Sequence, residues 1–214
     1  MAVKSRIVAV VPMKPLTESK TRLSAQLSPS QRATLSLSMF KWVVQTLGKS
    51  NVSRVVVVGG DNAVEAASLR EGAEWIKDEY LELNKAIEFA FESVWEEGLS
   101  AAYIPADLPL LTVADVNGMI DASEQGSLMT MCRAHDGGTN GIIVPPDLGF
   151  GPLLGSDSYR RHQMLAEELK VRYRSYESDG FYRDIDTIED LRICMDLSPP
   201  CLVEIAEALK DVSE

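Results

Sequence analysis

The sequence predicts a single α/β domain, residues 1–214, with a mostly parallel sheet and helices on both faces. Its 214 residues suit one domain, and no linker or internal repeat divides them. Short apolar, β-branched runs typical of buried parallel strands alternate with segments of helical periodicity. The connections between them are short, which favours β-α-β units with a covered sheet.

The predicted strands are short apolar runs that stop at turn-forming residues. The first, 7–11, is Ile-Val-Ala-Val-Val, and the second, 54–58, stops at Gly59-Gly60-Asp61. The same pattern predicts strands at 75–76, 101–104, 128–131, 141–144 and 171–176.

The predicted helices combine an apolar period of 3.6 residues with capping residues. The capping box Ser28-Pro29-Ser30-Gln31 begins the first helix, and we expect Gly48 to end it. Further helices are expected at about 62–70, 83–97, 112–123 and 158–169, after Thr187, and after Pro199-Pro200. The last is expected to be long and apolar, with Leu202, Ile205 and Leu209 packing within one subunit or in a homodimer.

Composition excludes several classes of protein. A formal net charge of −11 argues against binding to nucleic acids or anionic membranes, which require clustered Lys and Arg. The three cysteines, Cys132, Cys194 and Cys201, are odd in number and lack metal-site spacing, so we expect buried thiols in a reducing compartment. The apolar N-terminal stretch is too short for a membrane helix and lacks a signal-peptide cleavage site. We therefore expect a cytoplasmic protein.

Three unusual loops, 12–28, 105–111 and 145–157, each follow a predicted strand. Ligands bind beyond the carboxyl ends of strands in such sheets, so one site can gather all three loops. The first loop carries Lys14, Lys20 and Arg22 just before a helix, although it is neither a Walker A nor a GxGxxG loop. These cations suit a nucleotide triphosphate, and the alternative is a solvated loop with ordinary charges.

Three aspartates form a candidate metal site. Asp107 lies between two prolines after a strand, and Asp184 and Asp186 share one side of the chain if it is extended, with Ile185 pointing into the core. Three carboxylates from two distant segments suit Mg²⁺, which prefers hard oxygen ligands. The alternative is that Asp186 merely precedes the cap Thr187, Asp184 is solvated and Asp107 stabilises a turn.

Two glycine-containing segments are candidates for ligand binding. Thr139 and Asn140, within Asp-Gly-Gly-Thr-Asn-Gly, offer side-chain donors where the backbone allows close approach, although a hairpin turn explains the same residues. Gly155 and Ser158 lie where a helix begins, and Ser158 can also simply cap it. The two histidines have no metal-ligand spacing, and we expect His162 at the surface or behind the site. The sequence contains no GxSxG motif, so covalent catalysis is not predicted.

Seven motifs occur in order over nearly the whole chain: VPMKPLTESKTRLS, SPSQRATLSLSMF, LNKAIEFA, IPADLPLL, DGGTNGIIVPP, GSDSYRRH and DIDTIEDL. Together they resemble the 2-phospho-L-lactate guanylyltransferase family of coenzyme F-420 biosynthesis. The resemblance implies a Rossmann-like sheet of the nucleotide-diphospho-sugar transferase type. It also implies a reaction in which phosphoenolpyruvate, 2-phospho-L-lactate or another phosphorylated three-carbon acid attacks the α-phosphate of GTP and releases pyrophosphate.

The resemblance also implies roles for individual residues. The implied Mg²⁺ ligands are Asp107, Asp184 and Asp186, and Asp107 is also implied as a catalytic residue. The implied positions for the acceptor carboxylate are Thr139, Gly155 and Ser158. The implied catalytic and triphosphate-binding cations are Lys14, Lys20 and Arg22, and Asn84 is implied near the guanine nucleotide.

This chemistry agrees with the absence of a catalytic His or Cys motif. A phosphate monoester is largely dianionic near neutral pH, so the acceptor needs no general base. The reaction instead needs charge neutralisation and in-line placement of two anions. The rival hypotheses are a related nucleotidyltransferase or glycosyltransferase that uses a sugar phosphate or molybdopterin, and a non-catalytic nucleotide-binding regulator.

Overall fold

The computed structural model describes residues 5–80 and 82–212. Its seven-stranded sheet has the order β3-β2-β1-β4-β6-β5-β7. Strand β6 runs antiparallel to both β4 and β5, and all other neighbouring pairs are parallel. The predicted strands are all present, with these bounds: β1 Ile7–Met13, β2 Arg54–Gly59, β3 Glu74–Ile76, β4 Ser100–Tyr103, β5 Met129–Arg133, β6 Thr139–Val144 and β7 Tyr173–Ser175.

The helices alternate with the strands as predicted, and their capping boxes are confirmed at Ser28, Thr112 and Thr187. The α-helices are α1 Pro29–Lys49, α2 Asn62–Arg70, α3 Leu83–Glu96, α4 Val113–Ala122, α5 Ser158–Glu168, α6 Asp179–Tyr182, α7 Ile188–Asp196 and α8 Pro200–Val203. The 3-10 helices of the described residues are η1 Leu16–Glu18, η2 Thr21–Leu23 and η3 Ala206–Val212.

The prediction that Gly48 ends α1 is wrong. The helix continues through Gly48 to Lys49, and Ser50 takes an extended conformation as the C-cap. The backbone N–H and the hydroxyl of Ser50 both donate to the Leu47 carbonyl, at 3.0 and 2.7 Å. A serine side chain thus satisfies the helix end that a left-handed glycine was expected to close.

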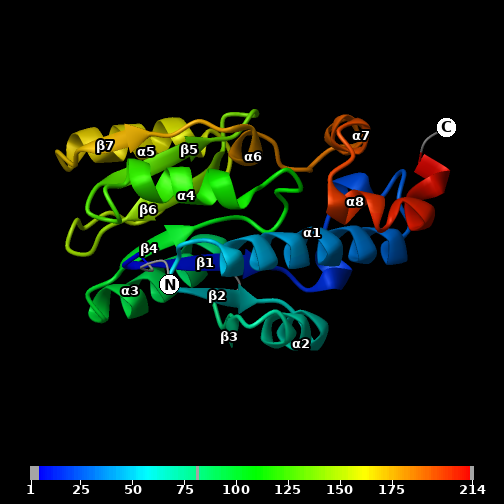
Figure 1. Cartoon of the computed structure of the whole chain (residues 1–214), viewed down its shortest axis with the longest axis horizontal. Helices are drawn as coiled ribbons and strands as arrows, with labels where there is room; N and C mark the ends of the chain where they lie inside the picture. The colour runs from blue at the N-terminus through cyan, green and yellow to red at the C-terminus, as the bar shows by residue number, and fades with distance from the viewer. Residues whose placement is uncertain (1–4, 81, 213–214) are drawn as a thin grey trace.

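Both faces of the sheet are covered, as predicted (Figure 1). Alternate β1 residues point to opposite faces, so Ala9 packs in one apolar cluster and Val10 in another. The first cluster includes buried residues of α1, α2 and α4, and the second those of α3 and α5. This double cover explains why the central strands are apolar along their whole length.

The C-terminal segment forms a third apolar cluster. The prediction of a long C-terminal helix is wrong, because α8 ends at Val203 and a 3-10 helix follows from Ala206. Leu202 and Leu209 are buried in this cluster with residues of α1. Packing against α1 therefore overrides the helical pattern, and Figure 1 shows α8 beside α1. These leucines are covered within the subunit and offer no dimer face.

Over the part of the chain that the structure describes, no helix is both long enough and apolar enough to cross a membrane.

Candidate functional site

The basic loop, which we define as residues 14–28, leaves the carboxyl end of β1 and folds into η1 and η2. Asp61 anchors its start: one carboxylate oxygen accepts the Leu16 N–H at 2.8 Å, and the other caps α2 by accepting from Ala63 and Val64. Lys20 has a left-handed backbone, with φ +50°, at the beginning of η2. These contacts give the loop a defined structure around Lys20.

Two of the three predicted loop cations contact the predicted acids. The Lys20 ammonium lies 2.5 Å from Asp107 Oδ2 and 3.1 Å from Asp186 Oδ1, and its side chain is only 9% exposed. Burial alone would lower the pKa of Lys20, but the two carboxylates outweigh it and raise that pKa above its usual value. Arg22 is exposed and contacts Asp186 Oδ2 at 2.8 Å. Lys14 lies exposed at the start of the loop.

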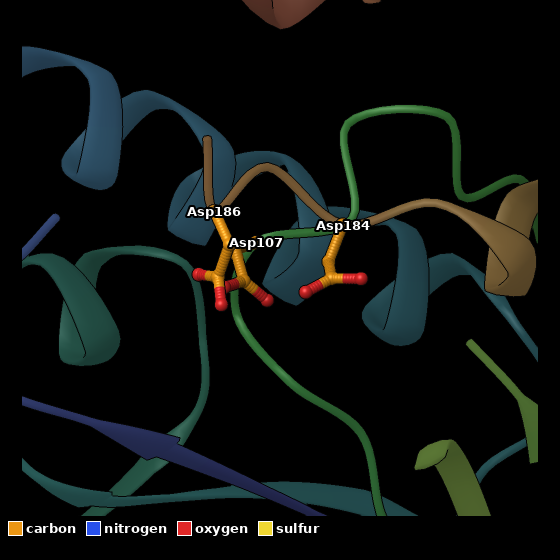
Figure 2. Close-up of side chains that lie close together, drawn as sticks. All are labelled: Asp107, Asp184 and Asp186. Carbon is orange, nitrogen blue, oxygen red and sulfur yellow. The ribbon is translucent and has the colours of Figure 1, made fainter. Parts of the chain in front are cut away.

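The three predicted aspartates lie together. One carboxylate oxygen from each of Asp107, Asp184 and Asp186 falls within 4.8 Å of the others, and Figure 2 shows the three side chains pointing to the same side. Asp184 and Asp186 flank Ile185, which is fully buried and donates its N–H to the Asp107 carbonyl at 3.3 Å. That backbone bond joins the two distant segments, and the extended spacing places both carboxylates on one side.

These residues fit a hard divalent cation. Asp107 Oδ1 is buried and makes no hydrogen bond to any residue that the structure describes. The pKa of Asp184 is raised to about 6 by burial and by the charge of Asp107, with a smaller contribution from Asp186. Crowded, desolvated carboxylates of this kind are stabilised by a bound cation, and an all-oxygen donor set suits Mg²⁺ or Mn²⁺.

Two further side chains, those of Asn140 and His135, contact Asp184. Asn140 donates its amide to Asp184 Oδ1 at 3.0 Å. His135 lies with Nδ1 3.6 Å from Asp184 and Nε2 2.9 Å from Asp190, whose other oxygen accepts from Thr187. The sequence signalled Asn140 as a donor and Asp190 as part of a cap, but no pattern linked His135 to either acid.

The predicted acceptor-binding residues meet on the other side of Asn140. Thr139 begins β6, directly before Asn140, and the buried Ser158 hydroxyl donates to Thr139 Oγ1 at 3.1 Å. The suggestion that Ser158 caps α5 is wrong, because Asp157 occupies the N-cap position and Ser158 is the first helical residue. Gly155 is exposed with φ +117°, a conformation that favours glycine. The hairpin alternative for the DGGTN segment is confirmed, since it connects β5 to β6.

His162 lies behind these residues, so the second of its two expected positions is confirmed and the surface position is excluded. Its ring is fully buried, with Nδ1 3.0 Å from Thr139 Oγ1 and Nε2 2.7 Å from the Leu153 nitrogen. Its partners, Thr139 and Leu153, lie elsewhere in the chain. The charged neighbours Arg160 and Arg161 therefore did not indicate that His162 is buried.

Asn84 does not line the cleft described next. Its side chain bonds to the backbone of Leu154, accepting from the nitrogen at 2.7 Å and donating to the carbonyl at 3.3 Å. It therefore joins the first turn of α3 to the 145–157 loop.

A cleft of about 650 Å³ lies between the basic loop and the carboxyl ends of β1, β2 and β4. Its lining includes the cations Lys14, Lys20 and Arg22 and the acids Asp107 and Asp186. Apolar residues from the start of α3 also line it. Thr139, Gly155 and Ser158 are outside it and are linked to the acids through Asn140. The cleft, with its cations and carboxylates, can hold a phosphate-rich ligand and a divalent cation.

Comparisons with known proteins show the family of this chain. A family profile described as "Guanylyl transferase CofC like" matches residues 7–196. The chain is 35% identical over 185 residues to a phosphoenolpyruvate guanylyltransferase of Roseiflexus sp. (strain RS-1), covering 86% of this chain and 83% of that one. It is 31% identical over 203 residues to a 3-phospho-D-glycerate guanylyltransferase of Colwellia psychrerythraea, covering 94% and 97%. It is 32% identical over 184 residues to a 2-phospho-L-lactate guanylyltransferase of Methanothermobacter thermautotrophicus, covering 86% and 81%.

Solved structures share the fold. A protein described as a nucleotide-diphospho-sugar transferase, from Desulfovibrio desulfuricans G20, superposes with a TM-score of 0.77 at 17% identity, covering 97% of this chain and 98% of that one. A manganese complex of Rv0371c from Mycobacterium tuberculosis superposes with a TM-score of 0.57 at 19% identity, covering 89% and 98%. The predicted Rossmann-like, nucleotide-diphospho-sugar transferase-like fold is confirmed.

Proposed function

Because this chain belongs to the CofC-like guanylyl transferase family, we propose that it transfers GMP from GTP to a phosphorylated three-carbon acid in coenzyme F-420 biosynthesis. The acceptor's phosphate oxygen attacks the α-phosphorus of GTP, a new P–O bond forms, and the bond to the β-phosphate breaks to release pyrophosphate. One domain, residues 1–214, carries this activity.

One observation carries the proposal: the acids Asp107, Asp184 and Asp186 meet the cations Lys20 and Arg22 at one edge of the sheet. We assign Mg²⁺ to the three carboxylates, where it would neutralise phosphate charge and orient the two substrates. The fit rests on the buried, unpartnered oxygen of Asp107 and on the raised pKa of Asp184.

Side chains of the protein bind the triphosphate and neutralise its charge in this proposal. Lys14, Lys20 and Arg22 bind the triphosphate and balance the charge of the departing pyrophosphate, which a strongly acidic protein otherwise repels. Asn84 assists the nucleotide indirectly, by holding the 145–157 loop against α3. The acceptor phosphate is already dianionic near neutral pH, so no side chain has to remove a proton from it.

Thr139, Gly155 and Ser158 form the acceptor subsite in this proposal. The bond from Asn140, the neighbour of Thr139, to Asp184 supports a position for the acceptor carboxylate close to the proposed metal ligands. The relatives are named for phosphoenolpyruvate, 3-phospho-D-glycerate and 2-phospho-L-lactate, so experiment has to determine which of these acids is the acceptor. We propose a cytoplasmic location, supported by three cysteines that are free and buried.

The test is pyrophosphate release with GTP and Mg²⁺, with each of the three acids supplied separately. We expect release with one acid above the other two, and a product that contains GMP joined to that acid. Asp186→Asn is the control, because it removes a proposed metal ligand and should abolish turnover without unfolding the protein. Release without any acid, or full activity of the Asp186→Asn protein, would contradict the proposal.

A further inference from the structure

His162 connects the proposed acceptor subsite to the 145–157 loop. Its ring is fully buried against Phe150, with centroids 5.8 Å apart. Both ring nitrogens have partners: Nε2 faces the Leu153 N–H at 2.7 Å, and Nδ1 faces Thr139 Oγ1 at 3.0 Å. A buried histidine with two directional partners has a restricted choice of tautomer.

The backbone decides that tautomer. The Leu153 N–H can only donate, so Nε2 must accept and carries no proton. In the neutral ring the proton is then on Nδ1, which donates to Thr139 Oγ1. Burial and the neighbouring Arg161 charge lower the pKa of His162 to about 4, so the ring stays neutral near pH 7.

The Nδ1–H group also decides the direction of the Thr139 hydroxyl. Thr139 Oγ1 accepts from His162 and from the Ser158 hydroxyl at 3.1 Å, which uses both of its lone pairs. Its own proton must therefore point away from both residues. Thr139 is only 5% exposed, so the proton is available only to a hydrogen-bond acceptor that reaches the small remaining surface of this side chain.

We propose that His162 is a positioning residue that makes Thr139 a hydrogen-bond donor to the carboxylate of the acceptor substrate. The inference rests on the proposed function, since it takes the three-carbon acid as the ligand beside Thr139. A carboxylate only accepts hydrogen bonds, so a threonine locked as a donor favours a carboxylate over a group that must donate.

His162 holds the loop as well. Arg161 donates to the carbonyls of Leu153 and Leu154, and Asn84 bonds to both backbone groups of Leu154. The same short segment is thus fixed by α5, through His162 and Arg161, and by the start of α3, through Asn84. A substitution of His162 therefore has two separable effects, one on Thr139 and one on the loop.

Two substitutions separate these effects, because each keeps one nitrogen's function. In His162→Asn the amide group takes the place of Nδ1 and still donates to Thr139, while the acceptor for Leu153 is lost. In His162→Gln the carbonyl takes the place of Nε2 and still accepts from Leu153, while the donor to Thr139 is lost. Met164→Ala, at an exposed position on the same helix, is the matched control.

The expected kinetic result is a difference in KM. His162→Gln should raise the KM of the acceptor acid about tenfold or more, with the KM of GTP changed by less than about twofold. His162→Asn should stay near the wild-type KM for the acid but show faster proteolysis of the 145–157 loop. Equal acceptor KM values in the two variants would overturn the role of His162. A wild-type protein that turns over none of the acids would instead overturn the proposed function.

The tautomer is measured without any turnover. In ¹⁵N-labelled protein, the ¹⁵N shifts and ¹⁵N–¹H couplings of the imidazole distinguish Nδ1–H from Nε2–H, and the chain has only two histidines. His162→Gln assigns the signal by removing it. We expect the Nδ1–H form at pH 7, and an Nε2–H form or a charged ring at that pH would overturn the inference.

Discussion

At the scale of single residues, the three carboxylates of the site are not equivalent. Asp107 and Asp186 contact the Lys20 ammonium, whereas Asp184 contacts the neutral amide of Asn140 and lies 3.6 Å from His135. Asp184 therefore bears most of the cost of burying three acids together, and its pKa rises to about 6.

Asp184→Asn should stabilise the metal-free protein above pH 6. An aspartate whose pKa in the folded state is about 6 instead of 3.8 binds its proton more tightly when folded. Its contribution to stability is full below pH 3.8 and is lost as the pH rises through 6. At pH 8 the ionised side chain costs up to about 3 kcal/mol, which the neutral amide avoids while still accepting from Asn140. Thermal unfolding at pH 8 and pH 4.5, with a chelator present, measures the difference.

Asp186→Asn is the matched control for that measurement. It removes one charge from the same cluster but also weakens the contacts with Lys20 and Arg22, so no stabilisation is expected. Equal stabilisation by both variants would show that ionised Asp184 destabilises the folded protein no more than ionised Asp186 does.

At the scale of elements, the basic loop depends on one residue outside it. Asp61 accepts the Leu16 N–H and caps α2 at the same time. Asp61→Ser should keep the cap, because a serine hydroxyl accepts from the first turn of a helix, but lose the bond to Leu16. We expect the KM of GTP to rise several-fold with little change in thermal stability, as measured by steady-state kinetics and calorimetry.

Asp61→Ala separates the two roles of this residue. It removes the cap as well, which costs about 1 kcal/mol, and should therefore lower the melting temperature in addition to raising the KM of GTP. An unchanged KM in both variants would mean that the bond to Leu16 does not position the loop cations.

The features predicted from sequence were those that depend on near neighbours. The capping boxes at Ser28, Thr112 and Thr187, the apolar strands, and the alternation that buries Ile185 are all encoded within a few residues. The joining of Asp107 to Asp184 and Asp186 was also predicted, from the suitability of three carboxylates for one Mg²⁺ ion and from the family resemblance.

The remaining features depend on partners far along the chain. His162 is buried because Thr139 and Leu153 use its two nitrogens, and Ser158 bonds to Thr139 rather than capping α5. Neither arrangement leaves a periodic or local signal in the sequence. The family resemblance indicated Thr139 and Ser158 as binding residues, but it did not indicate that His162 connects Thr139 to the 145–157 loop.

At the scale of the whole molecule, the metal-binding acids depend on the third apolar cluster. Ile185, between Asp184 and Asp186, is buried with Leu23 and Leu27 of the basic loop and with Leu202 and Leu209 from the C-terminal segment. The acids, the loop that carries the cations and the last turns of the chain therefore share one core. Loosening that core should affect the site without any change in the residues that form it.

Leu202→Ala tests this dependence, and Val203→Ala is its neighbour control. Leu202 is 2% exposed, so its truncation should cost about 2–4 kcal/mol, whereas Val203 is 57% exposed and should cost less than about 0.5 kcal/mol. Chemical denaturation measures both, and titration of Mn²⁺ on the folded proteins measures the site. If the cluster positions Ile185, Leu202→Ala should also weaken Mn²⁺ binding. Loss of stability with unchanged Mn²⁺ affinity would mean that the backbone bond to Asp107 suffices to hold the acids.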